Sequence, residues 1–298
     1  MIYNMKTIMR TAVFFTMPLL YLVLFADTLS AQTPYSGGMY IDVRWDRTDT
    51  IGEATMRLEY LMRFPSETGP DSSHVDRRIV EIGPGLQKEY SLILEASEMA
   101  GHNAWKQADG AFDSHDPDSP VNPFELYLTP DGITVIHKTI ILGPVLRWRE
   151  DTPAFDWELT SDTCTVMGYK CQKAVTEFRG RVWHAWFCPA LPVDGGPYKF
   201  RGLPGLILKA EDTTGTYSWE LTAIERGSWP ILEKRLLYQD CTRSQARKYI
   251  RQMFTNPYQW KVSRGMRVYK GDPQTHQLRA LTHEEKSESF HYDPIELD

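Results

Sequence analysis

The sequence predicts a mainly β protein, built as a curved antiparallel sheet or an open (half) β-barrel with one or two packed helices. Many segments alternate apolar and polar residues at period two, as in Ala54–Phe64, where Met56, Leu58 and Tyr60 share one side. Turns with glycine or proline separate these segments, as at Pro130-Asp131-Gly132. No repeat of fixed period and no linker interrupts the pattern, which indicates a single β-rich domain.

Residues 1–31 are predicted to be a signal peptide. Lys6 and Arg10 precede an apolar run, Thr11–Ala26, which is followed by small residues. The run is short for a membrane span, which needs about 20 apolar residues. We therefore expect cleavage after residue 31, and a domain of residues 32–298 that is periplasmic or secreted and does not span the membrane. An uncleaved anchor is the alternative.

The formal net charge of −6 becomes −7 without the leader, which removes two basic residues and one acidic residue. One stretch, 241–270, is basic throughout and has no acidic residue. Its cations are Arg243, Arg247, Lys248, Arg251, Lys261, Arg264, Arg267 and Lys270. Nucleic acid is excluded as a partner of an exported chain, so the stretch either meets an acidic partner or lipid phosphate, or is the solvated side of a helix.

Strands are predicted along the first half of the chain wherever the alternation recurs between turns. They are Met39–Asp46, Arg77–Ile82, Phe124–Leu128, Ile133–His137, Val145–Arg149 and Phe155–Leu159. Leu86–Trp105 is ambiguous and fits a helix that ends at Gly101. Asp109–Pro120 is rich in aspartate but lacks the residue order of an EF-hand loop, and the histidines nearby are scattered, so we predict a solvated loop and no metal site.

The segment Gly168–Pro189 is predicted to be a β-hairpin that turns at Arg179-Gly180. With this turn, Cys171 lies opposite Cys188 at a non-hydrogen-bonded position, where the Cα atoms approach to about 4.5 Å. Four cysteines in an exported chain favour a disulfide between these two, although a reactive thiol pair is an alternative. The two remaining cysteines either form a second bridge or stay free: Cys164 and Cys241.

One helix is predicted with a defined start and stop. Thr242 or Ser244 supplies the N-cap, and Asn256-Pro257 ends the helix. Its apolar residues recur at helical spacing: Ala246, Tyr249, Ile250, Met253 and Phe254. A strand over Tyr217–Ala223 precedes this helix, and short strands around Tyr258–Tyr269 and a charged tail are expected after it.

The stretch Gly196–Asp212 (GPYKFRGLPGLILKAED) is predicted to be a doubly kinked loop that leads into a strand at Leu206. We predict that it forms a recognition loop, with Lys199 offering its cation to an acidic or phosphate group. Equally, Lys199 covers the neighbouring rings with its aliphatic stem. The residues of this candidate loop are Tyr198, Lys199, Phe200, Gly202, Leu203, Pro204 and Gly205.

Several motifs of this chain resemble those of the GLPGLI family. They are Gly168-Tyr169-Lys170-Cys171, Arg179-Gly180-Arg181, Ala185-Trp186-Phe187, Gly196–Phe200, Gly202–Ile207 and Asp293–Leu297. The resemblance is strongest over Trp157–Glu225, and it implies an exported envelope protein of Gram-negative bacteria with no established activity or cofactor. Cys188 departs from the family pattern, where small or hydroxyl residues are usual, so the predicted bridge is particular to this chain.

Two classes of function remain open at this point. The first is a non-catalytic envelope protein whose curved sheet binds a lipid, a peptide or a protein partner. The second is a hydrolase or thiol-dependent enzyme, which requires a nucleophile paired with a base. The sequence around His184 identifies no such partner, so we predict no catalytic residue and no cofactor, and we favour the first class.

Overall fold

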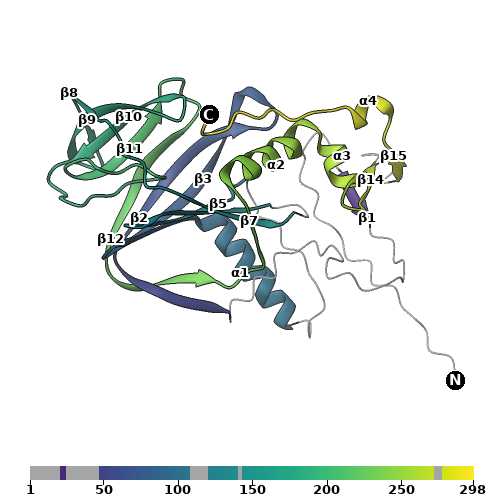
Figure 1. Ribbon diagram of the computed structural model, residues 1–298, viewed down its shortest axis with the longest axis horizontal. Coiled ribbons are helices and arrows are strands. Elements are labelled where there is room, and N and C mark those ends of the chain that lie inside the picture. The colour runs from purple at the N-terminus through teal and green to yellow at the C-terminus, as the bar shows by residue number, and fades with distance from the viewer. Residues whose placement is uncertain (1–20, 25–46, 108–119, 140–142, 272–276) are drawn as a thin grey trace. The chain divides into compact units, whose positions relative to one another are not determined.

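The chain forms two compact units (Figure 1). The larger unit consists of residues 33–257 and 289–298, and the smaller of 1–32 and 258–288. This computed structural model describes residues 21–24, 47–107, 120–139, 143–271 and 277–298. The predicted strand Met39–Asp46 lies outside the described residues, as do most of the leader and of the aspartate-rich loop, so the boundary after residue 31 stays a prediction.

Twelve strands of the described part of the larger unit form one open sheet, in the order β13-β7-β6-β5-β4-β3-β2-β12-β11-β10-β9-β8. All neighbours are antiparallel except β13 and β7. The mainly β, open-sheet architecture predicted from the alternation is therefore confirmed. The strands are β2 (Thr48–Ser66), β3 (Gly69–Gly83), β4 (Leu86–Ser91), β5 (Phe124–Thr129), β6 (Gly132–Lys138), β7 (Val145–Glu150), β8 (Glu158–Val166), β9 (Tyr169–Phe178), β10 (Arg181–Cys188), β11 (Leu206–Asp212), β12 (Ser218–Lys234) and β13 (Tyr238–Asp240).

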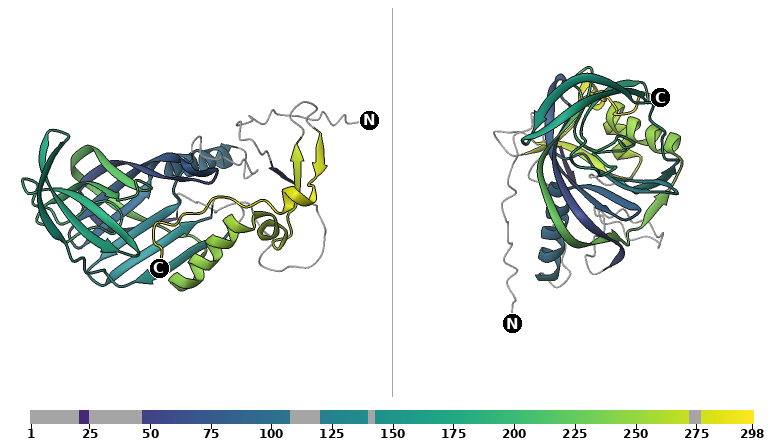
Figure 2. Two further views of the ribbon diagram at one scale, coloured as in Figure 1. Left: turned by 90° about the horizontal axis from the view of Figure 1, so that it is seen from above. Right: turned by 90° about the vertical axis from the view of Figure 1, so that its left-hand side faces the viewer.

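Two long strands, β2 and β12, run side by side through the middle of the sheet. Their pairing shifts register at three points, between Leu221 and Ala223, between Arg226 and Trp229, and between Ile231 and Leu232. Each irregularity of this kind bends the strands and increases their twist. The sheet therefore curls around one face, as Figure 2 shows.

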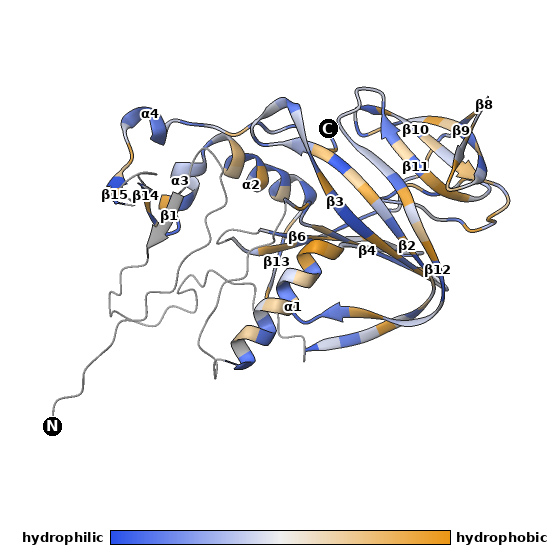
Figure 3. Ribbon diagram, turned by 180° about the vertical axis from the view of Figure 1, so that it is seen from behind, coloured by the Kyte–Doolittle hydropathy of each residue, from blue (hydrophilic) through white to orange (hydrophobic). Residues whose placement is uncertain are grey.

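The concave face of the sheet holds the main hydrophobic core. On β2, Met56, Leu58, Tyr60 and Met62 are all buried, as their spacing predicted. Figure 3 shows the same alternation of hydrophilic and hydrophobic residues along β2, β3 and β12. Because successive side chains point to opposite faces, one face of these strands is apolar and the other meets solvent.

Two helices pack against the sheet. α2 (Arg243–Thr255) lies on the concave face, and Thr242 caps it together with Gln245 in a capping box. α1 (Leu92–Gln107) follows β4, so the ambiguous segment Leu86–Trp105 is a strand that becomes a helix. The side chain of Ser91 accepts a hydrogen bond from the Leu94 N–H at 3.1 Å and fixes the start of α1.

The prediction of strands around Tyr258–Tyr269 is wrong in its first half, which is helical in α3 (Pro257–Val262). The described part of the smaller unit also contains α4 (His283–Lys286) and a three-stranded sheet of β1 (Tyr21–Leu24), β14 (Arg267–Gly271) and β15 (Leu278–Ala280). β8 begins only at Glu158, so the predicted strand Phe155–Leu159 is wrong over its first three residues, where Phe155 and Trp157 stack on each other. Among the described residues, no helix is both long and apolar enough to span a bilayer.

Candidate functional site

The loop predicted as an exposed recognition tip is a buried part of the core. Tyr198, Lys199 and Phe200 lie between β10 and β11 and expose only 6%, 2% and 0% of their surface. The loop folds back over the concave face. The N–H groups of Leu206 and Ile207 donate to the carbonyls of Leu191 and Gly195, at 2.8 and 3.0 Å. The prediction of an exposed tip is therefore wrong, because a curved sheet of this size needs a cover for its apolar inner face.

Phe200 is the centre of an aromatic cluster inside the sheet. Its ring centroid lies 4.9 Å from that of Trp183, 5.7 Å from Phe155 and 6.1 Å from Trp219. Tyr198 stacks on Trp219 with an interplanar angle of 18°. Aromatic pairs at these separations add to the stability that apolar burial already supplies. The two aromatic residues of the loop thus anchor it to β10 and β12.

Lys199 uses its charge inside the protein. Its Nζ lies 2.8 Å from Glu150 Oε2 and 2.7 Å from Glu296 Oε1, and Tyr198 donates its hydroxyl to the same Glu296 atom at 2.7 Å. Burial raises the pKa of Glu296, but the cations of Lys199 and Arg243 outweigh burial and lower that pKa below its usual value. The prediction that Lys199 offers its cation at an exposed tip is wrong. The structural alternative is closer, since Lys199 is buried with its Nζ 5.2 Å from the Tyr198 ring centroid, but it did not include the ion pairs with Glu150 and Glu296.

The backbone of the loop is tied to a second buried ion cluster. Tyr198, at a φ of 57°, donates its N–H to the carboxylate of Glu89, which also accepts from Arg78 Nε at 3.0 Å. Arg78 donates in addition to the carbonyl oxygens of Asn122 and Phe124, at 2.8 and 2.6 Å. A buried charge with this many partners holds its neighbours in one geometry. The loop is therefore fixed by side chains of β3 and β4.

The two loop glycines have different surroundings. Gly205 adopts a φ of +151°, and a Cβ placed on it would lie 2.2 Å from the carbonyl oxygen of Cys188. Gly202 adopts a φ of +85°, but nothing lies closer than 4.0 Å to its Cβ position. Between them, Leu203 is buried and Pro204 is exposed. The predicted need for glycine is confirmed by geometry at both positions, and it is more severe at Gly205.

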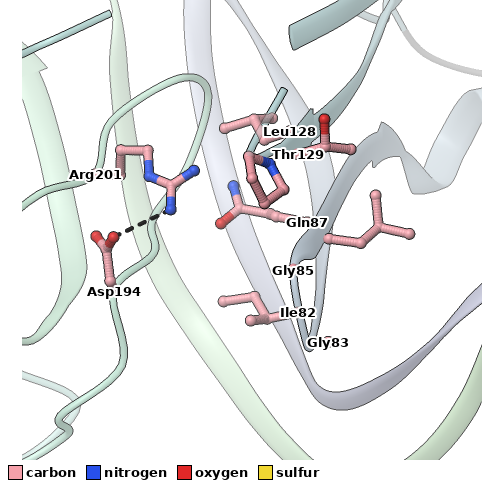
Figure 4. A pocket seen from close by; sticks show the side chains of 10 residues that line it. Ile82, Gly83, Gly85, Gln87, Leu128, Thr129, Asp194 and Arg201 are labelled. Carbon is pink, nitrogen blue, oxygen red and sulfur yellow. Dashed lines mark hydrogen bonds and ion pairs between the residues drawn. The ribbon is translucent and has the colours of Figure 1, made fainter. Parts of the chain in front are cut away.

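A small open pocket lies beside this loop (Figure 4). Its volume is about 130 Å³, which is the size of one side chain rather than of a typical small-molecule ligand. Arg201 and Asp194, both from the loop, form an ion pair of 3.2 Å at its edge. The residues that line it come from the β3–β4 turn, the β5–β6 turn and the loop: Ile82, Gly83, Gly85, Leu86, Gln87, Leu128, Thr129, Pro130, Asp194 and Arg201.

All four cysteines are free thiols in the structure. The register that predicted a Cys171–Cys188 bridge is confirmed from Phe178 opposite Arg181 to Gln172 opposite Phe187. The Cys171–Cys188 bridge is not formed. On the other side of β9, Cys171 lies opposite Cys164 in the register of β8 and β9, and these two thiols are also not bonded. Burial, together with the two neighbouring thiols, raises the pKa of Cys171 to about 12.

Within the part of the chain that the structure describes, no group of three or more His, Cys, Asp or Glu side chains is placed to hold a metal ion. His184 lies opposite Val175 in the hairpin, as the turn at Arg179-Gly180 predicted. Burial lowers the pKa of His184, and the charge of Lys173 lowers it further.

The sequence did not identify the acidic partners of the loop. Glu89, Glu150 and Glu296 lie far from it along the chain, at separations of 109 residues from Tyr198 and of 49 and 97 residues from Lys199. Only Glu296 could have been singled out from the sequence as a candidate partner, because it belongs to the closing motif Asp293–Leu297 that resembles the family. The pocket could not be predicted, because its residues come from two turns and the loop, which are distant from one another in sequence.

Residues 177–209, which run from the end of β9 through the loop into β11, match the model of a family described as "Protein of unknown function (Porph_ging)". Two solved structures are similar: "Structure of PNGF-II in P21 space group", at 15% identity and a TM-score of 0.40, and "Structure of PNGF-II in C2 space group", at 14% and 0.42. Each match covers 68% of this chain and 32% of the other, so the chain spans about a third of their length. No curated protein matches.

Proposed function

We propose that the protein is an exported envelope protein of the GLPGLI type that binds a peptide or protein partner and catalyses no reaction on it. Export is supported by the basic, apolar and small residues of the leader. The GLPGLI type is supported by the motifs around the loop. Residues 177–209, which contain several of these motifs, match a family of unknown function described as Porph_ging.

The observation that carries the binding role is the pocket beside the loop. Ile82, Leu86 and Leu128 give it an apolar lining, and Arg201 and Asp194 place one charge of each sign at the edge. A hollow that fits one side chain and is lined by both apolar and polar groups suits the anchor residue of a peptide. A whole lipid is a poorer match to about 130 Å³.

The enzyme alternative has less support from the same structure. The reactive form of cysteine is the thiolate, and a pKa of about 12 keeps Cys171 protonated at neutral pH. The N–H of Tyr198 is hydrogen-bonded to Glu89, and Lys199 forms ion pairs with Glu150 and Glu296. While residues 293–298 are in place, these two side chains have carboxylate partners and do not act on a substrate.

Site-specific photo-crosslinking in the native envelope tests the proposal. A photoreactive residue is placed at Arg201 or, as the matched control, at Arg147, whose side chain is 34% exposed against 33% for Arg201 and is also paired with an aspartate. We expect one discrete peptide or protein adduct at position 201 and none at 147. The same adducts at both positions, or a lipid adduct at 201, would contradict a pocket-bound polypeptide.

Export has its own test, because binding and localisation can fail separately. Intact-mass measurement of the protein from the periplasm or medium is expected to give a chain that begins at Gln32. A chain that retains Met1 to Ala31 would show that the leader is not removed.

A further inference from the structure

A second candidate site lies where the end of the chain returns to the larger unit. Residues 289–298 belong to this unit, although the smaller unit's 258–288 separates them from the rest of it in sequence. The segment contains no helix or strand. Phe290 donates its N–H to the carbonyl of Phe254 at 2.8 Å, and Tyr292 stacks on the ring of Phe254 at 5.0 Å. The segment is thus held by side chains and single backbone contacts, as a bound peptide is.

Arg181 binds the first carboxylate of the segment. Its guanidinium pairs with Asp293 and donates to the carbonyl of Pro294 at 2.8 Å, while Tyr217 donates its hydroxyl to the Asp293 carbonyl at 2.7 Å. The same guanidinium pairs with Asp212 of the sheet at 2.8 Å. Charge-assisted hydrogen bonds of this kind are about twice as strong as neutral ones.

Glu296 is the buried centre of the segment, with 7% of its surface exposed. It accepts from Lys199 at 2.7 Å, from the Tyr198 hydroxyl at 2.7 Å and from Arg243 Nε at 2.8 Å. Ile295, the residue before it, is also buried and joins the main hydrophobic core. One apolar side chain and one carboxylate therefore anchor the segment.

The last carboxylate lies nearer to solvent. Asp298, with a side chain that is 48% exposed, pairs with Arg243 at 2.6 Å and with Arg179 at 3.1 Å. Arg247 donates to the backbone carbonyl of Glu296 at 3.1 Å. Exposed ion pairs contribute little, so this end of the segment is held less firmly than its centre.

The charges on the two sides of this contact match. Five cations form what we call the arginine–lysine cluster: Arg179, Arg181, Lys199, Arg243 and Arg247. The larger unit itself supplies two carboxylates to them, Glu150 and Asp212, which leaves an excess of three positive charges. The segment supplies three negative charges, from Asp293, Glu296 and Asp298.

We propose that the arginine–lysine cluster is a recognition site for an extended acidic peptide segment, and that residues 293–298 of the chain occupy it in the described structure. The ligand carries carboxylates at its first, fourth and sixth positions and an apolar residue at the third, as in Asp-Pro-Ile-Glu-Leu-Asp. The competing segment that these contacts favour is residues 293–298 of a second copy of this chain, which carries the same carboxylates at the same spacing. The site is separate from the pocket beside the loop and does not depend on the function proposed for that pocket.

A tethered segment competes strongly with a free one. Tethering gives the chain's own segment an effective concentration in the millimolar range, so a free peptide meets an open cluster in only a small fraction of molecules. Weakening the tethered segment must therefore raise the apparent affinity for a free peptide. The cluster itself stays unchanged when the substitution is made in the segment.

The test measures binding of a fluorescent peptide with the sequence of residues 289–298 to the full-length protein, by anisotropy. Glu296→Gln in the protein should tighten binding about tenfold or more, because a buried charged hydrogen-bond partner is lost from the competitor. Asp298→Asn, which is more exposed and milder for the fold, should tighten it about threefold. The matched control Asp240→Asn removes a carboxylate from the exposed pair with Arg147 and should leave binding as in the wild type.

A peptide that itself carries Glu296→Gln should bind at least tenfold more weakly to each folded variant. The proposal is overturned if the wild-type peptide binds no variant that is folded by circular dichroism, or if Asp240→Asn tightens binding as much as Asp298→Asn. Sedimentation of the wild-type protein tests the second copy as the source of the ligand. A dimer that the free peptide dissociates supports it, and a protein that stays monomeric at all concentrations would contradict it.

Discussion

Replacing Gly205 with alanine should destabilise the fold far more than the same change at Gly202. Both glycines have positive φ, at +151° and +85°, so alanine strains the backbone at either position. Only at Gly205 does the new Cβ meet backbone atoms, 2.2 Å from the oxygen and 2.6 Å from the carbon of the Cys188 carbonyl. Backbone atoms cannot move aside as a flexible side chain can.

The magnitude follows from these two contributions. Backbone strain costs about 1–2 kcal/mol at each glycine. The clash at Gly205 adds about 1–3 kcal/mol, because either the loop or the end of β10 must shift. We therefore expect about 2–5 kcal/mol for Gly205→Ala and about 1–2 kcal/mol for Gly202→Ala. In a domain of this size, the larger loss lowers the melting temperature by roughly 4–20 °C.

Urea unfolding at neutral pH, followed by tryptophan fluorescence, measures both variants against the wild type. The slope of the transition should stay constant, so that the midpoint reports stability alone. Equal midpoints for the two alanine variants would refute the packing of the loop against β10 described above.

Three further predictions concern buried groups of the larger unit. Lys199→Met removes the cation that two buried carboxylates share, although each keeps an arginine, and should cost about 3–5 kcal/mol in urea unfolding. Lys209→Met, at a partly exposed pair, should cost less than about 1 kcal/mol, and similar losses for both variants would show that Lys199 is not buried. Burial lowers the pKa of His137 from 6.5 to about 4, so the stability that its neutral form contributes is complete above pH 6.5 and falls by about 3 kcal/mol as the pH approaches 4. His137→Phe should flatten the dependence of the unfolding free energy on pH in this window, and an unchanged slope would contradict a buried neutral histidine. Peptide mapping without reductant, on protein from the envelope, should find all four cysteines as free thiols, and a link from Cys171 to Cys188 or to Cys164 would contradict this.

The strands could be predicted because their determinants are local. Period-two alternation identified the buried side of β2, and the turn at Arg179-Gly180 set the register of β9 and β10. The start of α2 could be predicted because Thr242 and Gln245, three residues apart, form the capping box. Ser91 offered the same kind of signal for α1 and could have divided the ambiguous segment into a strand and a helix.

The position of the loop could not be predicted, because it depends on contacts between distant segments. The glycines and prolines determine the backbone conformations that the loop can adopt, and they carry no information on which face of the sheet it covers. A lysine between two aromatic residues suits an exposed tip as well as a buried ion pair. Only the approach of Glu150 and Glu296 decides between them, and both lie far from Lys199 in sequence.

The central claim is that the loop of residues 196–205 is a structural part of the core and not an exposed tip. Native-state hydrogen exchange of the Phe200, Gly205 and Leu206 amides tests it most directly, since these N–H groups donate to carbonyls within or beside the loop. We expect them to exchange as slowly as the amides of central β2, with a free energy of opening close to that of global unfolding. Exchange as fast as at the exposed Gly215 turn would contradict the claim.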